Sequence, residues 1–140
     1  MRPVVQLERT GCGIASVATL AGVTYREASR AANRMGISAA DARLWSETDY
    51  VRRLLRHYGI RPAWAQARFV SWQVLPALAL LAIKWRKEQG RACWHWVVFR
   101  RGRNGPVVLD PKRGLRTNTR TDFGRMRPKW FIAIEQSRGR

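Results

Sequence analysis

The spacing of hydrophobic residues changes near residue 60, and this change constrains the fold more than any other feature of the sequence. Before it, apolar residues recur every three or four positions, as on one face of an α-helix. After it, short runs of β-branched and aromatic residues are separated by Gly, Asn and Pro, which is typical of strands and turns. Helices followed by strands, rather than alternating with them, predict an α+β fold with an antiparallel sheet.

Three helices are expected before residue 60. Thr24, with Glu27 three positions later, forms a capping box at the start of a helix. Ser46 is expected to start the third helix by the same logic, with Asp49 in its first turn, where an acidic side chain is favourable. Glycines stand near the expected ends. The expected helices cover residues 11–22, 24–34 and 46–59.

Strands are expected after residue 60, with one helical turn at 71–75 ahead of Pro76. The strongest strand pattern is residues 94–100, where β-branched and aromatic residues dominate. Residues 78–85 fit either a helix or a buried strand, and their position ahead of a hairpin-like region favours a strand. The expected strands cover residues 60–65, 78–85, 94–100, 106–109 and 130–135.

The length of 140 residues is that of one domain. Residues 1–136 are expected to form it, and residues 137–140 to form a basic tail. The longest apolar run, residues 75–83, is much shorter than the roughly 20 residues of a membrane-spanning helix, so no transmembrane segment is expected. The first residues lack the pattern of a signal peptide, which predicts a cytoplasmic protein or one delivered without such a signal.

Basic residues greatly outnumber acidic ones. The sequence has 27 Lys and Arg against 9 Asp and Glu, a formal net charge of +18. A charge of this size attracts acidic partners, which include nucleic acid, an anionic membrane surface and acidic protein. An even spread over a solvated surface explains the same composition, and the sequence leaves both interpretations open.

Neither a disulfide nor a metal site is expected from the two cysteines. Cytosolic thiols stay reduced, which argues against a bond between Cys12 and Cys93. The histidines are His57 and His95, and no Cys or His pair has the spacing typical of zinc ligands. No cofactor is expected either.

Cys12 lies between two glycines at the start of the first expected helix. A thiolate there is stabilised by the positive end of the helix dipole and by unpaired backbone N–H groups. The same N–H groups can hold an oxyanion, and the side-chain amide of Gln6 can complete that site. Gly11 and Gly13 are expected to leave room for a substrate. A buried, unreactive Cys12 and a surface Gln6 fit the same positions.

His95 lies on the strongest strand, and Asp110 ends the next one. A turn centred at 102/103 would place Asp110 opposite His95, where the carboxylate binds one ring nitrogen and leaves the other for Cys12. A two-residue turn at 104–105 would instead shift the register and separate the two side chains.

His95 and Asp110 also have structural interpretations. A His on an apolar strand face is more often part of the core than catalytic, and an Asp before Pro can simply begin a turn. The catalytic interpretation is favoured because Gln6, Cys12, His95 and Asp110 occur in this order and on the expected types of element.

These four residues resemble the catalytic set of papain-like cysteine peptidases, and among them the compact bacterial peptidases that cleave double-glycine leader peptides. The segment from Gln6 to Ser16 is similar to the papain-like pattern in which Cys-Gly follows a Gln by six residues. Residues 95–98 (His-Trp-Val-Val) and 108–111 (Val-Leu-Asp-Pro) resemble the His strand and the Asp-Pro of the leader peptidases.

The resemblance implies a papain-like α+β fold, in which an N-terminal helical part carrying Cys12 packs on a C-terminal antiparallel sheet carrying His95 and Asp110. It implies that Cys12 is the nucleophile, His95 the general base and acid, and Asp110 the residue that orients His95. Gln6 would donate a hydrogen bond in the oxyanion hole. The chain has no ATP-binding loop of the exporters that carry leader peptidases, so removal of leaders during export is not expected.

The expected function is therefore that of a cysteine peptidase, which cleaves an amide bond of a peptide or protein substrate, acidic substrates included. It would act as a stand-alone processing protease or as a toxin or effector. One alternative is a basic nucleic-acid-binding module that uses the Arg clusters at 52–56 and 100–113. Another is a papain-like binding domain without catalytic activity.

Overall fold

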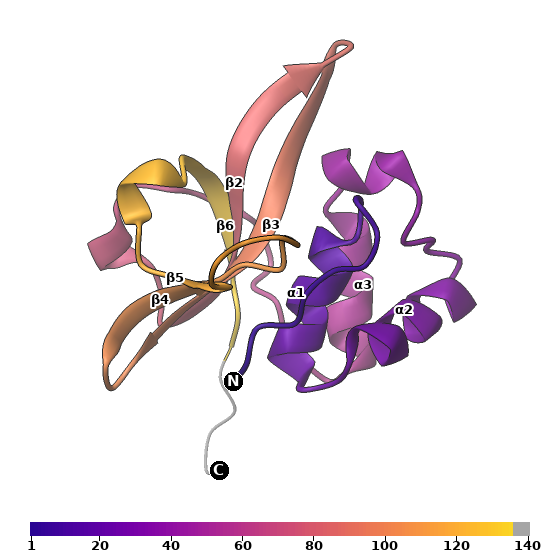
Figure 1. The fold of residues 1–140 in the computed structure, drawn as a ribbon, viewed down its shortest axis with the longest axis horizontal. Helices are drawn as coiled ribbons and strands as arrows, with labels where there is room; N and C mark the ends of the chain where they lie inside the picture. The colour runs from indigo at the N-terminus through magenta and orange to yellow at the C-terminus, as the bar shows by residue number, and fades with distance from the viewer. Residues whose placement is uncertain (136–140) are drawn as a thin grey trace.

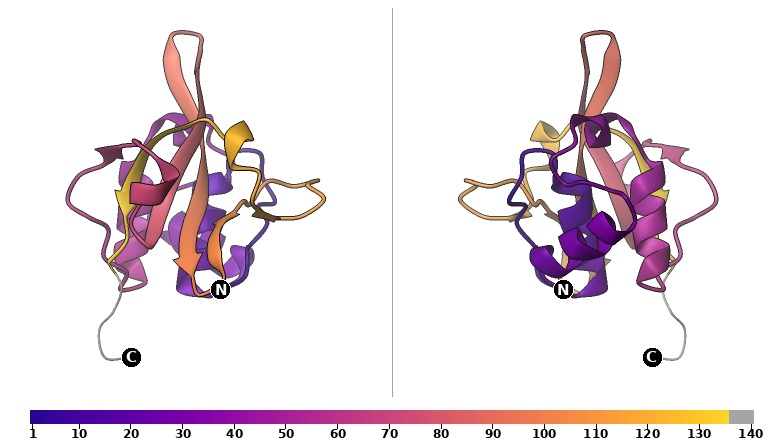
Figure 2. Two further views of the ribbon diagram at one scale, coloured as in Figure 1. Left: turned by 90° about the vertical axis from the view of Figure 1, so that its left-hand side faces the viewer. Right: turned by 90° about the vertical axis from the view of Figure 1, so that its right-hand side faces the viewer.

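Three helices pack on one face of a six-stranded antiparallel sheet (Figure 1) in the computed structural model of the chain, which describes residues 1–135. The turned views of Figure 2 show these helices on one side of the sheet. The α+β class predicted from the change in hydrophobic spacing is confirmed. The predicted basic tail, residues 137–140, lies outside the described residues. No helix within residues 1–135 is long and apolar enough to cross a bilayer.

The first two helices have the predicted ends. Gly22 follows the first helix with a φ of 71°, a left-handed conformation that glycine adopts at little cost. The Thr24 hydroxyl accepts a hydrogen bond from the Glu27 N–H at 3.1 Å and so caps the second helix. The helices are α1 (Cys12–Ala21), α2 (Tyr25–Arg34) and α3 (Asp49–His57).

The predicted start of the third helix at Ser46 was wrong. Residues up to Ser46 form a short 3₁₀ helix, η1 (Ala42–Ser46), which begins where the Asp41 carboxylate accepts a hydrogen bond from the Arg43 N–H at 2.9 Å. α3 begins three residues later, at Asp49, after Thr48. The local Asp41 cap therefore nucleates a separate turn that the helical spacing did not reveal.

The sheet has the strand order β1-β6-β2-β3-β4-β5. A strand was predicted at residues 60–65, but that segment contributes a single bridge between Pro62 and Ile134, since Pro has no N–H to donate to a ladder. The other predicted strands are confirmed within a few residues, and the helical turn at 71–75 is η2 (Trp72–Val74). The strands are β1 (Ala67–Arg68), β2 (Leu78–Glu88), β3 (Arg91–Gly102), β4 (Gly105–Leu109), β5 (Thr119–Arg120) and β6 (Pro128–Ala133).

The sheet separates two apolar clusters, because neighbouring residues of a strand point to opposite faces. The cluster between the helices and the sheet includes Ile14, Leu54, Leu80 and Trp96. The cluster on the opposite face includes Leu81, Val97, Phe99 and Met126, and loop aromatics pack against it. Of the three helices, α1 packs against β3 and reaches one edge of that strand at Trp96.

The close packing of α1 predicts an effect for Gly13→Ala. A Cβ at Gly13 would overlap the Tyr50 hydroxyl and lie 2.7 Å from the ring carbon that carries it. Overpacking of this kind costs about 1–3 kcal/mol, which should appear as a lower midpoint in urea unfolding. The control is Gly124→Ala, where a Cβ meets no atom within 4 Å. An equal effect of the two substitutions would contradict the packing role of Gly13.

Candidate active site

The first turns of α1 cover a free edge of β3. Within residues 1–135, β4 pairs with β3 from Val98 onward, and no strand lies beside Trp96 on that side. The Trp96 N–H donates to Cys12 Sγ at 3.4 Å, and the Trp96 carbonyl accepts from Ser16 Oγ at 3.3 Å. Cys12 and Ser16 are four residues apart and share a face of the helix. α1 thus takes the place of a strand, and Cys12 is held beside the residue that follows His95.

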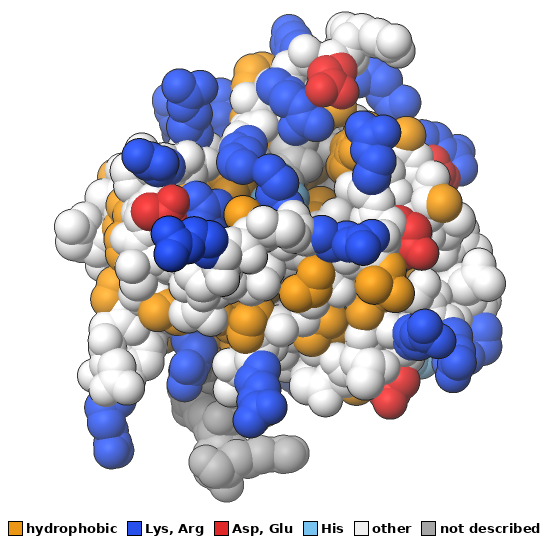
Figure 3. All heavy atoms as spheres, in the orientation of Figure 1, with side chains coloured by type: hydrophobic (Ala, Val, Ile, Leu, Met, Phe, Trp, Pro, Cys, Tyr) orange, Lys and Arg blue, Asp and Glu red, His pale blue; other side chains and the backbone are white. Residues whose placement is uncertain are grey.

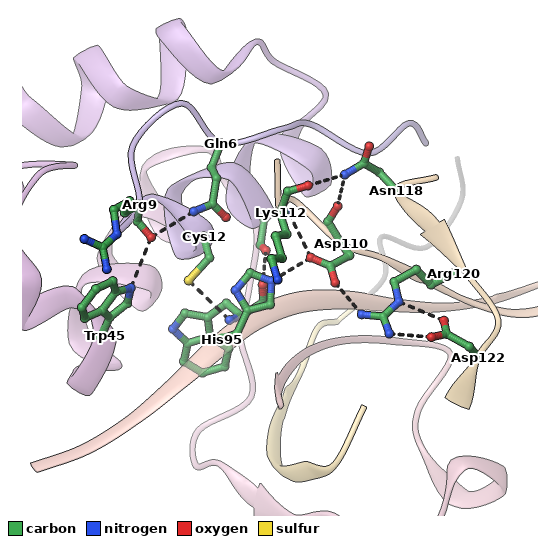
Figure 4. A network of polar contacts seen from close by, with 12 residues as sticks. Gln6, Arg9, Cys12, Trp45, His95, Asp110, Lys112, Asn118, Arg120 and Asp122 are labelled. Atoms are coloured by element: carbon green, nitrogen blue, oxygen red, sulfur yellow. Dashed lines mark hydrogen bonds and ion pairs between the residues drawn. The ribbon is translucent and has the colours of Figure 1, made fainter. Parts of the chain in front are cut away.

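His95 and Asp110 are hydrogen-bonded, with 2.7 Å between Nε2 and Oδ1 (Figure 4). Burial lowers the pKa of His95, but the hydrogen bond to Asp110 and the interaction with Cys12 outweigh it and raise that pKa to about 9. The imidazole therefore carries a proton at neutral pH. Because Nε2 is bonded to Asp110, Nδ1 is the nitrogen that remains for Cys12.

The turn between β3 and β4 differs from both turns considered from the sequence. It has two residues, at 103–104, and the ladder ends at Leu109. One step further, the same register would place Asp110 opposite Val97, which shares a face of the sheet with His95. Because the chain leaves the ladder after Leu109, the Asp110 side chain reaches diagonally to the imidazole. The turn is therefore not the one centred at 102/103 that was considered from the sequence, yet His95 and Asp110 are in contact.

The Asp110 carboxylate is buried and accepts three hydrogen bonds. Besides His95, the donors are the Lys112 N–H at 3.0 Å and Arg120 Nη1 at 2.8 Å. Arg120 is itself held by the Asp122 carboxylate, through Nε at 2.9 Å and Nη2 at 2.7 Å. Burial raises the pKa of a carboxyl group, but the His95 imidazole and the other donors outweigh it and hold the pKa of Asp110 well below its usual range. Asp110 therefore stays ionised beside a protonated ring.

Gln6 lies near Cys12, and its side-chain amide is engaged (Figure 4). Nε2 donates to the Glu8 carbonyl at 2.9 Å and to the Arg9 carbonyl at 3.0 Å, which uses both of its hydrogens. Oε1 is buried, with no hydrogen-bond partner among residues 1–135. The reversed amide would set Oε1 against two carbonyl oxygens, so the observed orientation is the favourable one. Donation to an oxyanion would require Nε2 to leave one of these carbonyls.

The glycines beside Cys12 make room for aromatic side chains rather than for a substrate, which corrects the expectation from the sequence. A Cβ at Gly11 would overlap the Tyr25 hydroxyl, and a Cβ at Gly13 would overlap Tyr50. Cys12 itself is 1% exposed. Its surroundings are thus tightly packed.

A cavity of about 490 Å³ opens beside His95, and Gln6, Trp45 and Trp94 are among the residues that line it. Figure 3 shows Lys and Arg side chains around a hollow on this face of the molecule. The one acidic residue in the cavity lining is Glu8, whose carboxylate accepts a hydrogen bond from the Tyr25 hydroxyl. The basic residues of the lining are Arg9, Lys84, Arg86, Lys112 and Arg113.

Within residues 1–135, no three His, Cys, Asp or Glu side chains come together as metal ligands. Cys12 and Cys93 are both buried free thiols. Cys93 Sγ lies 3.7 Å from Ser46 Oγ, away from the His95–Asp110 contact.

No protein-family model matches the sequence, and neither a curated protein nor a solved structure matches the chain.

Sequence reasoning missed Arg120, although its guanidinium binds Asp110 directly. Arg120 is one of 27 Lys and Arg residues and belongs to a two-residue strand, so neither composition nor periodicity distinguishes it. It also missed Lys84 and Lys112 as cavity residues. The one local signal that could have pointed to Arg120 is Asp122 two positions later, a spacing that allows an Arg–Asp ion pair along a strand.

The ionised state of Asp110 predicts a loss of stability in acid that Asp110→Asn should not show. The pKa of Asp110 is lowered in the folded state, so its contribution is present above about pH 4 and is lost as the pH falls toward the folded pKa. At pH 7, Asp110→Asn should cost on the order of 3 kcal/mol, because it leaves Arg120 and His95 without a buried counter-charge. Urea unfolding at pH 7 and pH 3 measures the free energy of unfolding of wild type and of Asp110→Asn. A difference between the two proteins that is as large at pH 3 as at pH 7 would contradict this role of Asp110.

The raised pKa of His95 predicts that its contribution to stability is lost at high pH, whereas that of Asp110 is lost at low pH. The pKa of His95 is raised to about 9, so the stabilisation from its protonation is full below about pH 6.5 and is lost as the pH rises through 9. The difference in unfolding free energy between wild type and His95→Gln should therefore shrink between pH 6.5 and pH 9.5. His57→Gln, on α3, controls for the His-to-Gln substitution itself. A constant difference for His95→Gln would show that the ring is not protonated in the fold.

Proposed function

We propose that the chain is a papain-like thiol hydrolase that cleaves an amide bond in a peptide or protein. The observation that carries the proposal is the hydrogen bond between His95 and Asp110, next to Cys12 at the first turn of a helix. The buried carboxylate orients the ring, the protonated ring faces the sulfur, and the sulfur accepts the Trp96 N–H. A nucleophile, a base and an orienting group in this relation are the parts of nucleophilic catalysis.

The reaction would begin with the Cys12 sulfur as a thiolate and His95 as an imidazolium. The sulfur attacks the carbonyl carbon of the scissile amide, and the carbonyl oxygen becomes an oxyanion. His95 then gives its proton to the amine, which leaves as the C–N bond breaks, and a thioester remains on Cys12. Water, deprotonated by His95, then attacks the thioester. The C–S bond breaks, the carboxylic acid product leaves, and the thiolate–imidazolium pair is restored. Each proton that leaves His95 returns to it within one cycle.

The oxyanion would be stabilised first by the Cys12 N–H, which has no acceptor within the helix at this N-terminal position. Gln6 supplies a second donor only if Nε2 is released from the Glu8 or Arg9 carbonyl. The buried, unpaired Oε1 lowers the cost of that change, since the amide already lacks one partner in the resting structure.

Alkylation of the folded protein tests the proposed nucleophile. At pH 7, iodoacetamide should modify Cys12 at least about tenfold faster than Cys93, because a thiol paired with an imidazolium reacts as the thiolate. Mass spectrometry of peptides identifies the modified residue. His95→Gln should slow the reaction at Cys12 by a similar factor, and Cys93→Ser should leave it unchanged.

Two outcomes would contradict the proposal. If Cys12 does not react in the folded protein, its burial closes the site, and a binding domain without catalysis becomes the better account. If Cys12 reacts at a rate that ignores His95, the thiol and the imidazole do not work as a pair. Salt-sensitive binding of nucleic acid by the same unreactive protein would favour the nucleic-acid-binding alternative.

A further inference from the structure

We propose that the cavity beside His95 binds an acidic peptide segment, whose carboxylates pair with Lys84 and Lys112 next to the scissile amide. This inference rests on the proposed function, since it names the substrate class of the same site. Its first support is the lining itself, in which five basic residues face one acidic residue. That acidic residue, Glu8, is already engaged by the Tyr25 hydroxyl.

The cations of the lining have few partners within the protein. Among residues 1–135, no carboxylate forms an ion pair with Arg9, Lys84, Lys112 or Arg113. The nearby Asp110 already accepts hydrogen bonds from three donors and forms no ion pair with the Lys112 ammonium group within residues 1–135. Like charges concentrated in one hollow repel each other, and an anionic ligand relieves that repulsion.

Lys84 is brought into the cavity by an irregularity of the sheet. Between the pairs Ile83–His95 and Arg86–Cys93, two residues of β2 oppose one residue of β3, which is a β-bulge. Lys84 has a φ of 54°, a left-handed conformation that is uncommon for a residue with a long side chain. Strained residues of this kind concentrate at ligand sites, and here the bulge directs a cation to the cavity wall beside His95.

Burial is the largest cause of a lowered pKa at Lys84, and the like charge of Lys112 adds to it. The two ammonium groups therefore lie close enough to affect each other. A bound carboxylate beside Lys84 would favour the charged form of that side chain.

A second pair of cations lies at Trp45. The guanidinium of Arg9 is 5.5 Å from the centre of the Trp45 ring, and that of Arg86 is 5.8 Å from it. Figure 4 shows Arg9 and Trp45 on the side of His95 away from Asp110, with Lys112 near Asp110. Basic groups thus flank the Cys12–His95 pair on two sides, which suits acidic side chains before and after the scissile bond.

The dimensions favour a peptide over nucleic acid. The cavity of about 490 Å³ is in the range of roughly 300–1,000 Å³ that holds a ligand of a few side chains. Nucleic-acid sites follow the backbone along an extended groove and stack bases on exposed aromatic rings. The cations here instead line one cavity beside His95.

The test measures binding apart from chemistry. In Cys12→Ser the thiol is removed, while an oxygen remains as acceptor for the Trp96 N–H. Fluorescence anisotropy compares a fluorescein-labelled peptide containing several Glu residues with the same peptide carrying Gln at those positions. The Glu peptide should bind about tenfold more tightly, because hydrogen bonds to charged groups are stronger than those to neutral groups.

The matched variants separate the cavity from the overall charge. Lys84→Gln with Lys112→Gln should weaken binding of the Glu peptide about tenfold, whereas Arg26→Gln with Arg30→Gln, on the exposed face of α2, should change it less than about twofold. Both pairs remove two charges, and thermal unfolding checks that both proteins fold. Equal binding of the two peptides, or equal effects of the two pairs, overturns the inference. Tighter binding of a single-stranded oligonucleotide that displaces the peptide also overturns it.

A second measurement distinguishes failure of the inference from failure of the proposed function. In the protein that retains Cys12, iodoacetate carries a negative charge and iodoacetamide does not. Lys84→Gln with Lys112→Gln should slow alkylation of Cys12 by iodoacetate about fivefold and leave the rate with iodoacetamide nearly unchanged. If neither reagent modifies Cys12, the proposed chemistry fails while peptide binding still decides the inference. If both substitutions leave both rates unchanged, the site has no cationic field and the inference fails.

Discussion

The contact between α1 and the free edge of β3 is the interaction on which the other features of the site depend. A buried strand edge must have its N–H and carbonyl groups satisfied, and at Trp96 the partners are Cys12 Sγ and Ser16 Oγ. The same helix also packs closely on α3, where a Cβ at Gly13 would overlap the Tyr50 hydroxyl. A longer β4 would occupy the same edge and displace the sulfur. The shortness of β4 and the position of α1 beside β3 therefore depend on each other.

Asp110 links the sheet edge to the rest of the chain. Its charge is buried, and an unpaired charge in that position would be strongly destabilising. Its donors come from β3, from the loop after β4 and from β5, so the carboxylate joins three segments. The adjoining Pro111 carbonyl accepts the Gln6 N–H at 2.9 Å and brings the N-terminal segment to the same loop. The orientation of His95 is thus set by several parts of the fold together.

The excess of basic residues has different consequences at different places. Arg120 is neutralised by Asp110 and Asp122 and is part of the support of His95. Arg26 and Arg30 lie exposed on α2, where solvent screens them. Lys84 and Lys112 both line the cavity beside His95, where burial and the like charge of Lys112 lower the pKa of Lys84. The same net charge is therefore structural in one location and of little consequence in another, and in the third it is the basis of the ligand recognition that we propose.

The sequence by itself determined the element types, because helical spacing, the Thr24 cap and the strand pattern around His95 are local signals. It also singled out Gln6, Cys12, His95 and Asp110 through their order on those elements. The tertiary structure decided the register between β3 and β4, the edge that α1 covers, and which Arg reaches Asp110. A one-residue change in a turn, or a bulge such as that at Lys84, redirects side chains without altering the local hydrophobic pattern. The packing of segments that are distant in the sequence selects among these arrangements, so only the tertiary structure decides them.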